Sequence, residues 1–548
     1  MKNLGPILLL FLILFLPLVT LFQPGLPITH DGADHVARIA NFYTSLSEGN
    51  LIPRWAGNLN WGYGHPILMF LYPLPSYIAS LFHFTGLSLV DSVKAVFGLS
   101  YILSGLFMYL WFRNFLGKFP ALSGAVLYSF APYRFVDLYV RGAIGEHLAF
   151  VFIPLIGYFL LKLTTAKKLN FFFFAGLSFS TAGLILSHNA ISLMFFPFVV
   201  VYTLYLFWIN KNKFLLVFSI AGVLYGFLLS SFFWIPAFLE GKYTLRDIVA
   251  GNEALTRFVE FKDLIFGAWS YGGSGVFSVQ IGIIIWFFIL LLPLGAYFLH
   301  KRNEKNSLIL LSLATVFFLG SIFLMLELSK SVWTFTTTLQ KFQFPWRFLT
   351  ISVFSSSLIG AYIVYSIKYQ KYQKFLLIIT ILASLILTKD YWKAKGFLNK
   401  PESFYKGIYN STTDTGESSP IWSVRFMEKK PKDSIEVIEG KASIKKLKRT
   451  TTERFYEIES IGTSRIRENT LYFPGWKVYV NGVLEKNIEF QDPANRGIIT
   501  FHIPDGKHSV MIVFENTKLR KISEAISTVS MLGLFVTGLA IKRKWLKI

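Results

Sequence analysis

The sequence predicts a polytopic α-helical membrane protein that carries a β-rich domain outside the membrane. Of its 548 residues, 53% are hydrophobic and only 16% are charged, whereas a soluble protein carries about a quarter charged residues. Apolar runs of about 17–25 residues recur along the chain, and each is long enough to cross the hydrocarbon core of a bilayer. The stretch 389–522 differs, because it has mixed charge and the alternating pattern of β-strands.

About twelve membrane-spanning helices account for the apolar runs. The segment 66–83 is apolar as well, but Pro66, Pro73 and Pro75 suit a broken segment at the membrane interface better than a straight span. The predicted helices cover residues 5–22, 92–112, 119–131, 147–163, 169–187, 189–209, 214–239, 279–299, 306–328, 347–367, 374–388 and 523–541.

The distribution of basic residues predicts which loops face the cytoplasm. If 66–83 does not cross, Lys2, the C-terminal lysines and the basic loops between alternate helices gather on one side, where Glu304 is the single acid. If 66–83 crosses, this bias is lost after Lys2. The positive-inside rule therefore places both termini in the cytoplasm. It also explains the net charge of +23 without nucleic acid as a partner.

This topology divides the chain into three regions. Residues 1–388 form the transmembrane domain, and its large first outer loop spans 23–91 with the interfacial segment inside it. Residues 389–522 form an extracytoplasmic domain. Residues 523–548 supply the last span and a basic cytoplasmic tail.

The outer domain is expected to be a small antiparallel β-sandwich. Asn481-Gly482 and Asp505-Gly506 stand between alternating runs and are typical of two-residue turns.

The whole chain contains no Cys, which excludes disulfides, thiolate catalysis and Cys-ligated metals.

Several long motifs resemble one family of membrane proteins. They are "THDGADHVARIANFYTSLSEGNLIPRW" in the first outer loop, "APYRFVDLYVRGAIGE", "LSHNAISLMF" and "QFPWRFL". They are similar to motifs of bacterial and archaeal proteins in the GT-C glycosyltransferase superfamily, in the group called "6-pyruvoyl-tetrahydropterin synthase-related" membrane proteins, next to the YfhO-like proteins. The chain lacks the Cys and the three-His zinc pattern of soluble pterin synthases, so pterin chemistry is not expected.

The resemblance implies a GT-C-like integral-membrane glycosyltransferase of the cell membrane. Such an enzyme moves a sugar, with inversion, from a polyprenyl-phosphate donor to an extracytoplasmic glycan, lipid or protein. An acid in the first outer loop takes the acceptor proton, and cations stabilise the departing lipid phosphate. Membrane lipids are further partners, and no cofactor is expected.

Asp31 lies a few residues past the first span and is the base that the resemblance implies. Its alternative role is to cap the helix that begins near Gly32. Asp34, His35 and Arg38 follow at helical spacing, so the pairs Asp31–His35 and Asp34–Arg38 fit one helical turn.

Other polar residues of this stretch are assigned to the substrate, namely His30, Asp34 and His35. Asp31 and Asp34 could instead hold a divalent cation. Hard cations usually gather more oxygen ligands than one such pair offers, so no obligatory metal is expected.

Glu146 is the second catalytic candidate, at the outer end of a predicted span. Its functional role would be an acceptor or metal contact that faces Asp31. Its alternative role is a salt bridge to Arg141 or Arg134, two residues that are themselves assigned to substrate binding.

Arg347 in "FPWR" is the main candidate for the phosphate, because the planar guanidinium suits bidentate phosphate contact. An interfacial arginine beside Trp346 is the alternative. His188 would contact phosphate or sugar, or would cap the next helix. Arg54 would line the sugar pocket, although loop packing is its commoner role.

Two other classes of protein are alternatives to a glycosyltransferase. A lipid or polysaccharide transporter would carry polar groups near the membrane midplane, whereas the predicted spans carry almost no ionisable residues. A non-catalytic membrane assembly protein with a GT-C-like core would share the motifs without turnover.

The charge argument predicts the topology directly. A reporter fused after Lys118 is expected to be cytoplasmic and one fused after Asn410 external, because the basic loops stay inside. Alkaline phosphatase and green fluorescent protein fusions measure this. The opposite pair of results would overturn the topology.

Overall fold

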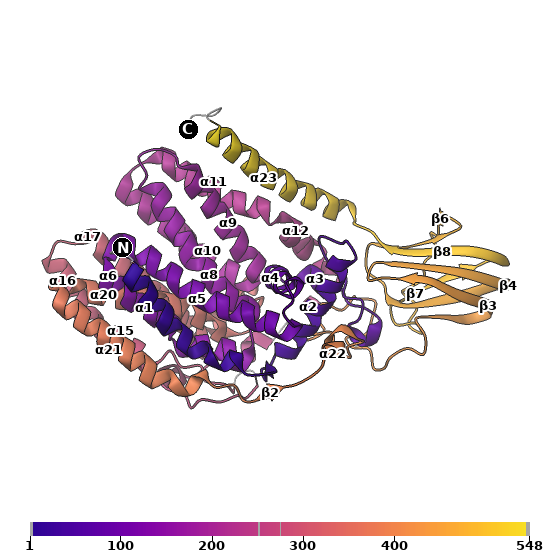
Figure 1. The fold of residues 1–548 in the computed structure, drawn as a ribbon, viewed down its shortest axis with the longest axis horizontal. Helices are drawn as coiled ribbons and strands as arrows, with labels where there is room; N and C mark the ends of the chain where they lie inside the picture. Colours follow the sequence, from indigo (N-terminus) through magenta and orange to yellow (C-terminus); the bar gives the residue numbers. More distant parts are fainter. Residues whose placement is uncertain (1–3, 250–252, 274–275, 544–548) are drawn as a thin grey trace.

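The structure is a computed structural model that describes residues 4–249, 253–273 and 276–543. It is a bundle of helices joined at one end to a β-sheet (Figure 1). The prediction of a mostly helical chain with a C-terminal β domain is therefore confirmed. The first residues of α1 and the last residues of α23 lie at the end of the bundle away from the sheet (Figure 1).

A helix occupies every predicted span. These helices are α1 (Leu4–Phe15), α5 (Leu89–Leu116), α6 (Lys118–Ser129), α8 (Ile144–Thr164), α9 (Phe171–Ser187), α10 (Asn189–Asn210), α11 (Lys213–Leu229), α12 (Ser231–Leu239), α15 (Ile283–Leu290), α16 (Leu292–Lys301), α17 (Lys305–Met325), α20 (Leu349–Ser366), α21 (Gln370–Thr388) and α23 (Lys518–Lys542). Shorter helices are α2 (Gly32–Ser47), α3 (Ile67–Phe70), α4 (Leu74–Phe84), α7 (Pro132–Phe135), α13 (Arg246–Val249), α14 (Phe261–Ile265), α18 (Lys330–Phe335), α19 (Thr337–Gln340) and α22 (Glu402–Lys406).

The described residues contain fewer candidate membrane spans than the sequence predicts. Among the described residues, 8 helices are long and apolar enough to cross a membrane, or up to 10 if each bent pair is one span. Helices α6, with 12 residues, and α9, with 17 residues, are shorter than the usual transmembrane length of about 20. The predicted count of twelve is not confirmed.

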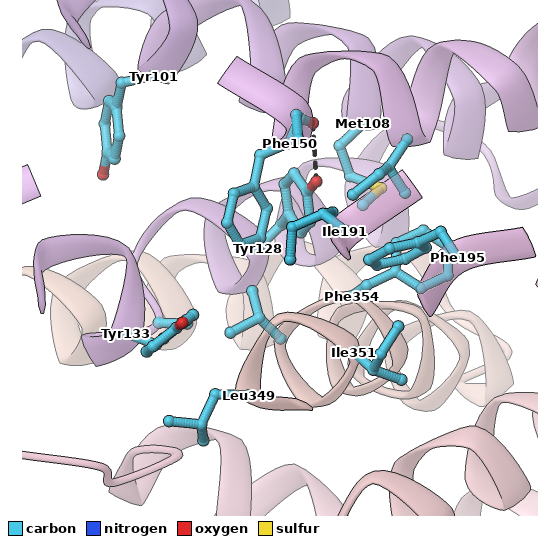
Figure 2. Close-up of a cluster of buried hydrophobic side chains, with 14 of the residues drawn as sticks. Tyr101, Met108, Tyr128, Tyr133, Phe150, Ile191, Phe195, Leu349, Ile351 and Phe354 are labelled. Carbon is cyan, nitrogen blue, oxygen red and sulfur yellow. Dashed lines mark hydrogen bonds between the residues drawn. The ribbon is translucent and has the colours of Figure 1, made fainter. Parts of the chain in front are cut away.

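Helix α20 lies at the centre of the bundle. The span Pro345–Ser366 that contains it is 94% buried. Phe354 and Ile351 of α20 face side chains of α5, α6, α8 and α10 (Figure 2), and the Tyr128 hydroxyl donates to the Phe150 carbonyl at 2.8 Å. Small residues let these helices approach closely, as is usual where apolar surroundings supply no hydrophobic driving force.

The break between α11 and α12 is stabilised by the last helix. The two helices meet at 69°, which frees backbone amides that a membrane cannot hydrate. The Ser527 hydroxyl of α23 accepts the Phe232 amide at 2.9 Å and lies 2.8 Å from the Ser231 hydroxyl.

The C-terminal β domain is one bent sheet. Its strands are β3 (Ile435–Arg449), β4 (Glu453–Leu471), β5 (Trp476–Val480), β6 (Val483–Leu484), β7 (Ile498–Ile503) and β8 (Gly506–Phe514), in the order β3-β4-β8-β5-β6 with β7 also on β4. It occupies only part of the predicted 389–522, and the two-layered sandwich is not confirmed. The segment before it carries the 3-10 helix Lys389–Trp392, the short pairing of β1 (Leu26–Pro27) with β2 (Phe397–Leu398), helix α22 and a single bridge from Pro420 to Thr244.

The two predicted turns have different outcomes. Asn481-Gly482 does join β5 to β6 as a hairpin. Asp505-Gly506 does not reverse the chain, because β7 and β8 pair with successive halves of β4 and act as one bent strand. Gly440, Gly462 and Gly506, on adjacent strands, have φ of 82°, 69° and 105°, a region that favours glycine. The glycines therefore bend the sheet where a turn was predicted.

The segment 132–146, predicted as an outer loop, is instead folded and buried. It forms α7 and a π-helix, Val136–Arg141, before α8 begins. Every residue of that π-helix is buried. The apolar residues Val136, Leu138 and Val140 alternate in the sequence with Asp137, Tyr139 and Arg141. The segment therefore places both apolar and charged side chains inside the bundle.

The first outer loop lies between the bundle and the sheet (Figure 1). Its apolar segment 66–83 is broken as predicted, because α3 ends at Phe70 and α4 begins at Leu74, with Pro66 and Pro73 at the two N-cap positions. Trp55 packs edge-on against Trp476 of β5 with ring centroids 5.3 Å apart. The loop is thus held in the core that it shares with the sheet.

Candidate functional site

A buried carboxylate, Glu146, lies at the centre of a polar cluster at the start of α8. Glu146 is 0% exposed. Its Oε1 accepts the Tyr133 hydroxyl at 2.6 Å and the Thr350 hydroxyl at 2.7 Å. Its Oε2 accepts Arg141 at 2.8 Å and lies 3.8 Å from Arg347 Nε. Glu146 therefore joins three elements, and its salt-bridge role is the one that the structure contains.

The π-helix determines the direction of Arg141. Asp137 and Arg141 share one face, and Arg141 Nη1 donates to Asp137 Oδ1 at 2.5 Å. The guanidinium lies over Trp346, 4.6 Å from the ring centroid. Single π-helical turns are often found at functional sites, and here the turn brings a buried arginine to the cluster.

Asp31 lies at the N-terminus of α2, and its side chain is exposed. It stands at the N-cap position but forms no capping bond, because the Thr29 hydroxyl accepts the Gly32 amide at 3.1 Å instead. The amide of Asp31 donates to the Arg141 carbonyl at 2.9 Å. The capping alternative is therefore not realised, and a free carboxylate lies beside the end of the π-helix.

Tyr72 and His188 close the opposite side. Their rings stack at 4.9 Å, and His188 Nδ1 accepts the Ile191 amide at 3.3 Å, so His188 also caps α10. Burial, and then Arg347, lowers the pKa of His188 to about 3. Burial raises the pKa of Tyr72 to about 12, and Asp31 and Arg347 are among the charges that act on it. The Tyr72 phenol therefore remains protonated near pH 7.

Three further residues of α2 approach the cluster. Burial raises the pKa of Asp34, whose Oδ1 accepts the Tyr409 hydroxyl at 3.0 Å. Burial, and then Arg38, lowers the pKa of His35 well below its usual value. Arg38 donates to the Thr413 carbonyl at 2.7 Å. Because His35 and His188 are neutral near pH 7, the positive charge of the cluster comes from its arginines.

Not every predicted residue belongs to this cluster. Arg54 donates to Glu524 at 2.8 Å and to the Phe232 carbonyl at 3.1 Å, and it connects the loop to α23 and α12. Arg134 is fully buried over the Phe150 ring and donates to Ser104 at 2.8 Å. His30 is exposed beside Asp31, and its amide donates to the Val140 carbonyl at 2.9 Å.

Metal ligands are sparse around the site. Within the described residues, no group of three or more His, Asp or Glu side chains is arranged to hold a metal ion.

Four residues in or beside the polar cluster were not predicted from the sequence as site residues: Tyr72, Tyr133, Asp137 and Thr350. Tyr133 and Asp137 belong to "APYRFVDLYVRGAIGE", and a buried polar pattern within an apolar context was the signal available for them. Thr350 lies 204 residues from Glu146, a pairing that sequence spacing does not indicate.

Fold and site together define a polytopic membrane protein with an exposed acid in the loop that follows its first helix and buried arginines at the adjoining helix ends. The chain belongs to the family described as "6-pyruvoyl-tetrahydropterin synthase related domain; membrane protein", whose sequence model matches residues 68–394. The family resemblance of the motifs is therefore confirmed.

Individual relatives are distant. An uncharacterized protein of Lactococcus lactis subsp. cremoris (strain MG1363) is 28% identical over 300 residues, which cover 51% of this chain and 47% of that protein. The chain therefore spans about half the length of this curated relative.

Among solved structures, the chain is similar to the arabinofuranosyltransferase AftD from Mycobacteria, with 13% identity and a TM-score of 0.49, over 73% of this chain and 28% of AftD. It is also similar to ArnT from Cupriavidus metallidurans bound to undecaprenyl phosphate, with 13% identity and a TM-score of 0.36, over 74% of this chain and 68% of ArnT.

The central role of Glu146 predicts a loss of stability when it is removed. Glu146→Ala leaves two buried arginines without their shared anion, which is expected to lower the free energy of unfolding by about 3–5 kcal/mol. Thermal unfolding in detergent, followed by tryptophan fluorescence, measures the change. Glu327→Ala is the control, because Glu327 is 76% exposed in its pair with Lys330. Equal unfolding temperatures for the two variants would contradict the assignment.

Proposed function

We propose that the protein is an integral-membrane glycosyltransferase that moves a sugar from a polyprenyl-phosphate donor to an extracytoplasmic acceptor. One observation carries the proposal. The main-chain amide of Asp31, whose side chain is exposed, donates to the Arg141 carbonyl at 2.9 Å, and Arg141 is one of two buried arginines around Glu146. This bond brings the backbone of the proposed base next to the backbone of a proposed cationic residue, which supports the assignment.

Asp31 is proposed as the general base. It takes the proton of the acceptor hydroxyl as that oxygen attacks the anomeric carbon, and the bond from this carbon to the phosphate oxygen breaks. Attack opposite the leaving group inverts the anomeric carbon. An exposed, uncapped carboxylate suits this task, because an incoming hydroxyl can reach it.

Arg141 and Arg347 are proposed to stabilise the departing lipid phosphate, which leaves with the electron pair of the broken bond. Guanidinium groups offer planar forks of donors that match phosphate oxygens. Glu146 is fully paired and is therefore assigned to positioning these arginines, in place of the catalytic contact that the sequence suggested. His188 and Tyr72 would line the same site.

The proposal extends to location and partners. The cluster and the sheet would face the outside of the cell membrane, with both termini cytoplasmic, and the acceptor would be a cell-envelope glycan, lipid or protein. Outside the cytoplasm ATP is lacking, so the activated sugar must arrive on a lipid, and a site beside helix ends suits such a donor.

Asp31→Asn tests the role of the base. The variant is expected to lower transfer by at least about 10²-fold, because it removes basicity at nearly constant size. Purified protein is incubated with a panel of polyprenyl-phosphate sugars, and mass spectrometry measures the freed lipid phosphate. Asp247→Asn, which changes an exposed acid on the short helix α13, is the matched control. Activity of Asp31→Asn within a few-fold of wild type would contradict the proposal.

The same assay tests the metal. Full activity is expected in excess chelator, because the proposed base and cations are side chains of the chain itself. Loss of activity that Mn²⁺ or Mg²⁺ restores would instead indicate a cation between Asp31 and Asp34.

A further inference from the structure

A segment far along the chain forms one wall of the site. Residues 409–417, here called the strap, lie against α2. Arg38 Nη2 donates to the Thr413 carbonyl at 2.7 Å, and the Tyr409 hydroxyl donates to Asp34 Oδ1 at 3.0 Å. Each contact joins residues 375 positions apart in the sequence. Arg38 is 5% exposed and Thr413 is 3% exposed, so the contact is sealed from solvent.

The other end of the strap reaches the loop that carries Arg347. Gln343 Nε2 donates to Glu417 Oε2 at 2.7 Å. Four residues later in that loop, Arg347 Nη1 donates to the Phe342 carbonyl at 2.9 Å. The strap therefore connects α2 with the loop of a phosphate-ligand candidate.

The backbone of the strap is firmly held. The amides of Asn60 and Trp61 donate to the carbonyls of Ser411 and Tyr409, both at 2.9 Å. Asp414 accepts two amides of its own turn, at 2.9 Å and 3.0 Å. Thr413 has a φ of 67°, which a β-branched residue adopts only where its surroundings impose it. The strap is thus built as a fixed wall.

The strap supplies hydrogen-bond partners to two opposite charges on α2. Asp34 and Arg38 are four positions apart on α2, a spacing at which a helix brings such side chains together. Within the described part of the chain they form no ion pair, because the strap supplies a partner to each. Arg38 Nε is buried without any hydrogen-bond partner. Arg38, together with Asp31 and Arg347, acts electrostatically on Tyr72.

We propose that the strap is a positioning element that binds the Asp34 carboxylate through Tyr409 in place of an Asp34–Arg38 ion pair, so that Arg38 serves as a third cationic ligand for the phosphate of the donor. The identity of the anion rests on the proposed function, whereas the role of the strap rests on the contacts above. Arg38 then keeps a positive charge that is not ion-paired with Asp34, and its Nε, which has no hydrogen-bond partner, belongs to the guanidinium fork that would bind a phosphate oxygen.

Binding of farnesyl phosphate to the full-length protein in detergent, measured by titration calorimetry, tests the strap without turnover. Tyr409→Phe removes one hydroxyl and frees Asp34 to neutralise Arg38, so the affinity is expected to fall about tenfold, the size of one hydrogen bond to a charged group. Tyr405→Phe is the matched control, because the Tyr405 hydroxyl is buried and has no partner. Equal affinities for Tyr409→Phe and wild type would overturn the proposal.

A second substitution distinguishes neutralisation of Arg38 by Asp34 from a loss of packing at Tyr409. In the Tyr409→Phe background, Asp34→Asn removes the charge that would neutralise Arg38, so the affinity for farnesyl phosphate is expected to recover. A double variant that binds as weakly as Tyr409→Phe would show that the hydroxyl only supports packing, and the proposal would be wrong.

The probe also distinguishes the two proposals. If wild type binds farnesyl phosphate and Tyr409→Phe binds it equally well, only the role of the strap fails. If wild type does not bind it, both the strap and the lipid-phosphate donor fail. Displacement by farnesol but not by inorganic phosphate would show recognition of the isoprenoid alone, and would overturn the role of Arg38.

Discussion

The pairing of Glu146 with its four partners is the constraint on which the site depends. A carboxylate that is withdrawn from water is stable only when opposite charge and hydrogen bonds surround it. They come from α7 (Tyr133), the π-helix (Arg141), the 3-10 helix Pro345–Phe348 (Arg347) and the start of α20 (Thr350). The central helix and the buried 132–141 segment are therefore fixed relative to each other by one anion.

The same rule explains where the helices break. Every interrupted backbone in the bundle needs a substitute partner, because lipid offers none. At the bend after α11 the Ser527 hydroxyl accepts an amide. At the end of the π-helix, the carbonyls of Val140 and Arg141 accept the amides of His30 and Asp31. This second break joins the first outer loop to the bundle, and it does so at the site.

Features that depend on a local sequence pattern could be predicted. The length of the apolar runs located the helices, and the prolines predicted the break in the segment 66–83. Features that depend on contacts between residues far apart in the chain could not be predicted. Thr29 caps α2 in place of Asp31, and Glu146 is enclosed by a residue 204 positions away. The bend in the sheet was not predicted, because Asp505-Gly506 has the composition of a turn. In the structure, β7 and β8 both pair with β4, so the chain continues in the same direction through Asp505-Gly506.

In the proposed reaction, the groups of the site have opposite requirements. A base must meet solvent and an incoming hydroxyl, which the exposed side chain of Asp31 satisfies. Cations that hold a phosphate act more strongly where water is excluded, which the buried side chains of Arg141 and Arg347 satisfy. The backbone bond from Asp31 to Arg141 serves both requirements, because it anchors the main chain of the exposed acid to the main chain of the residue that carries a buried guanidinium.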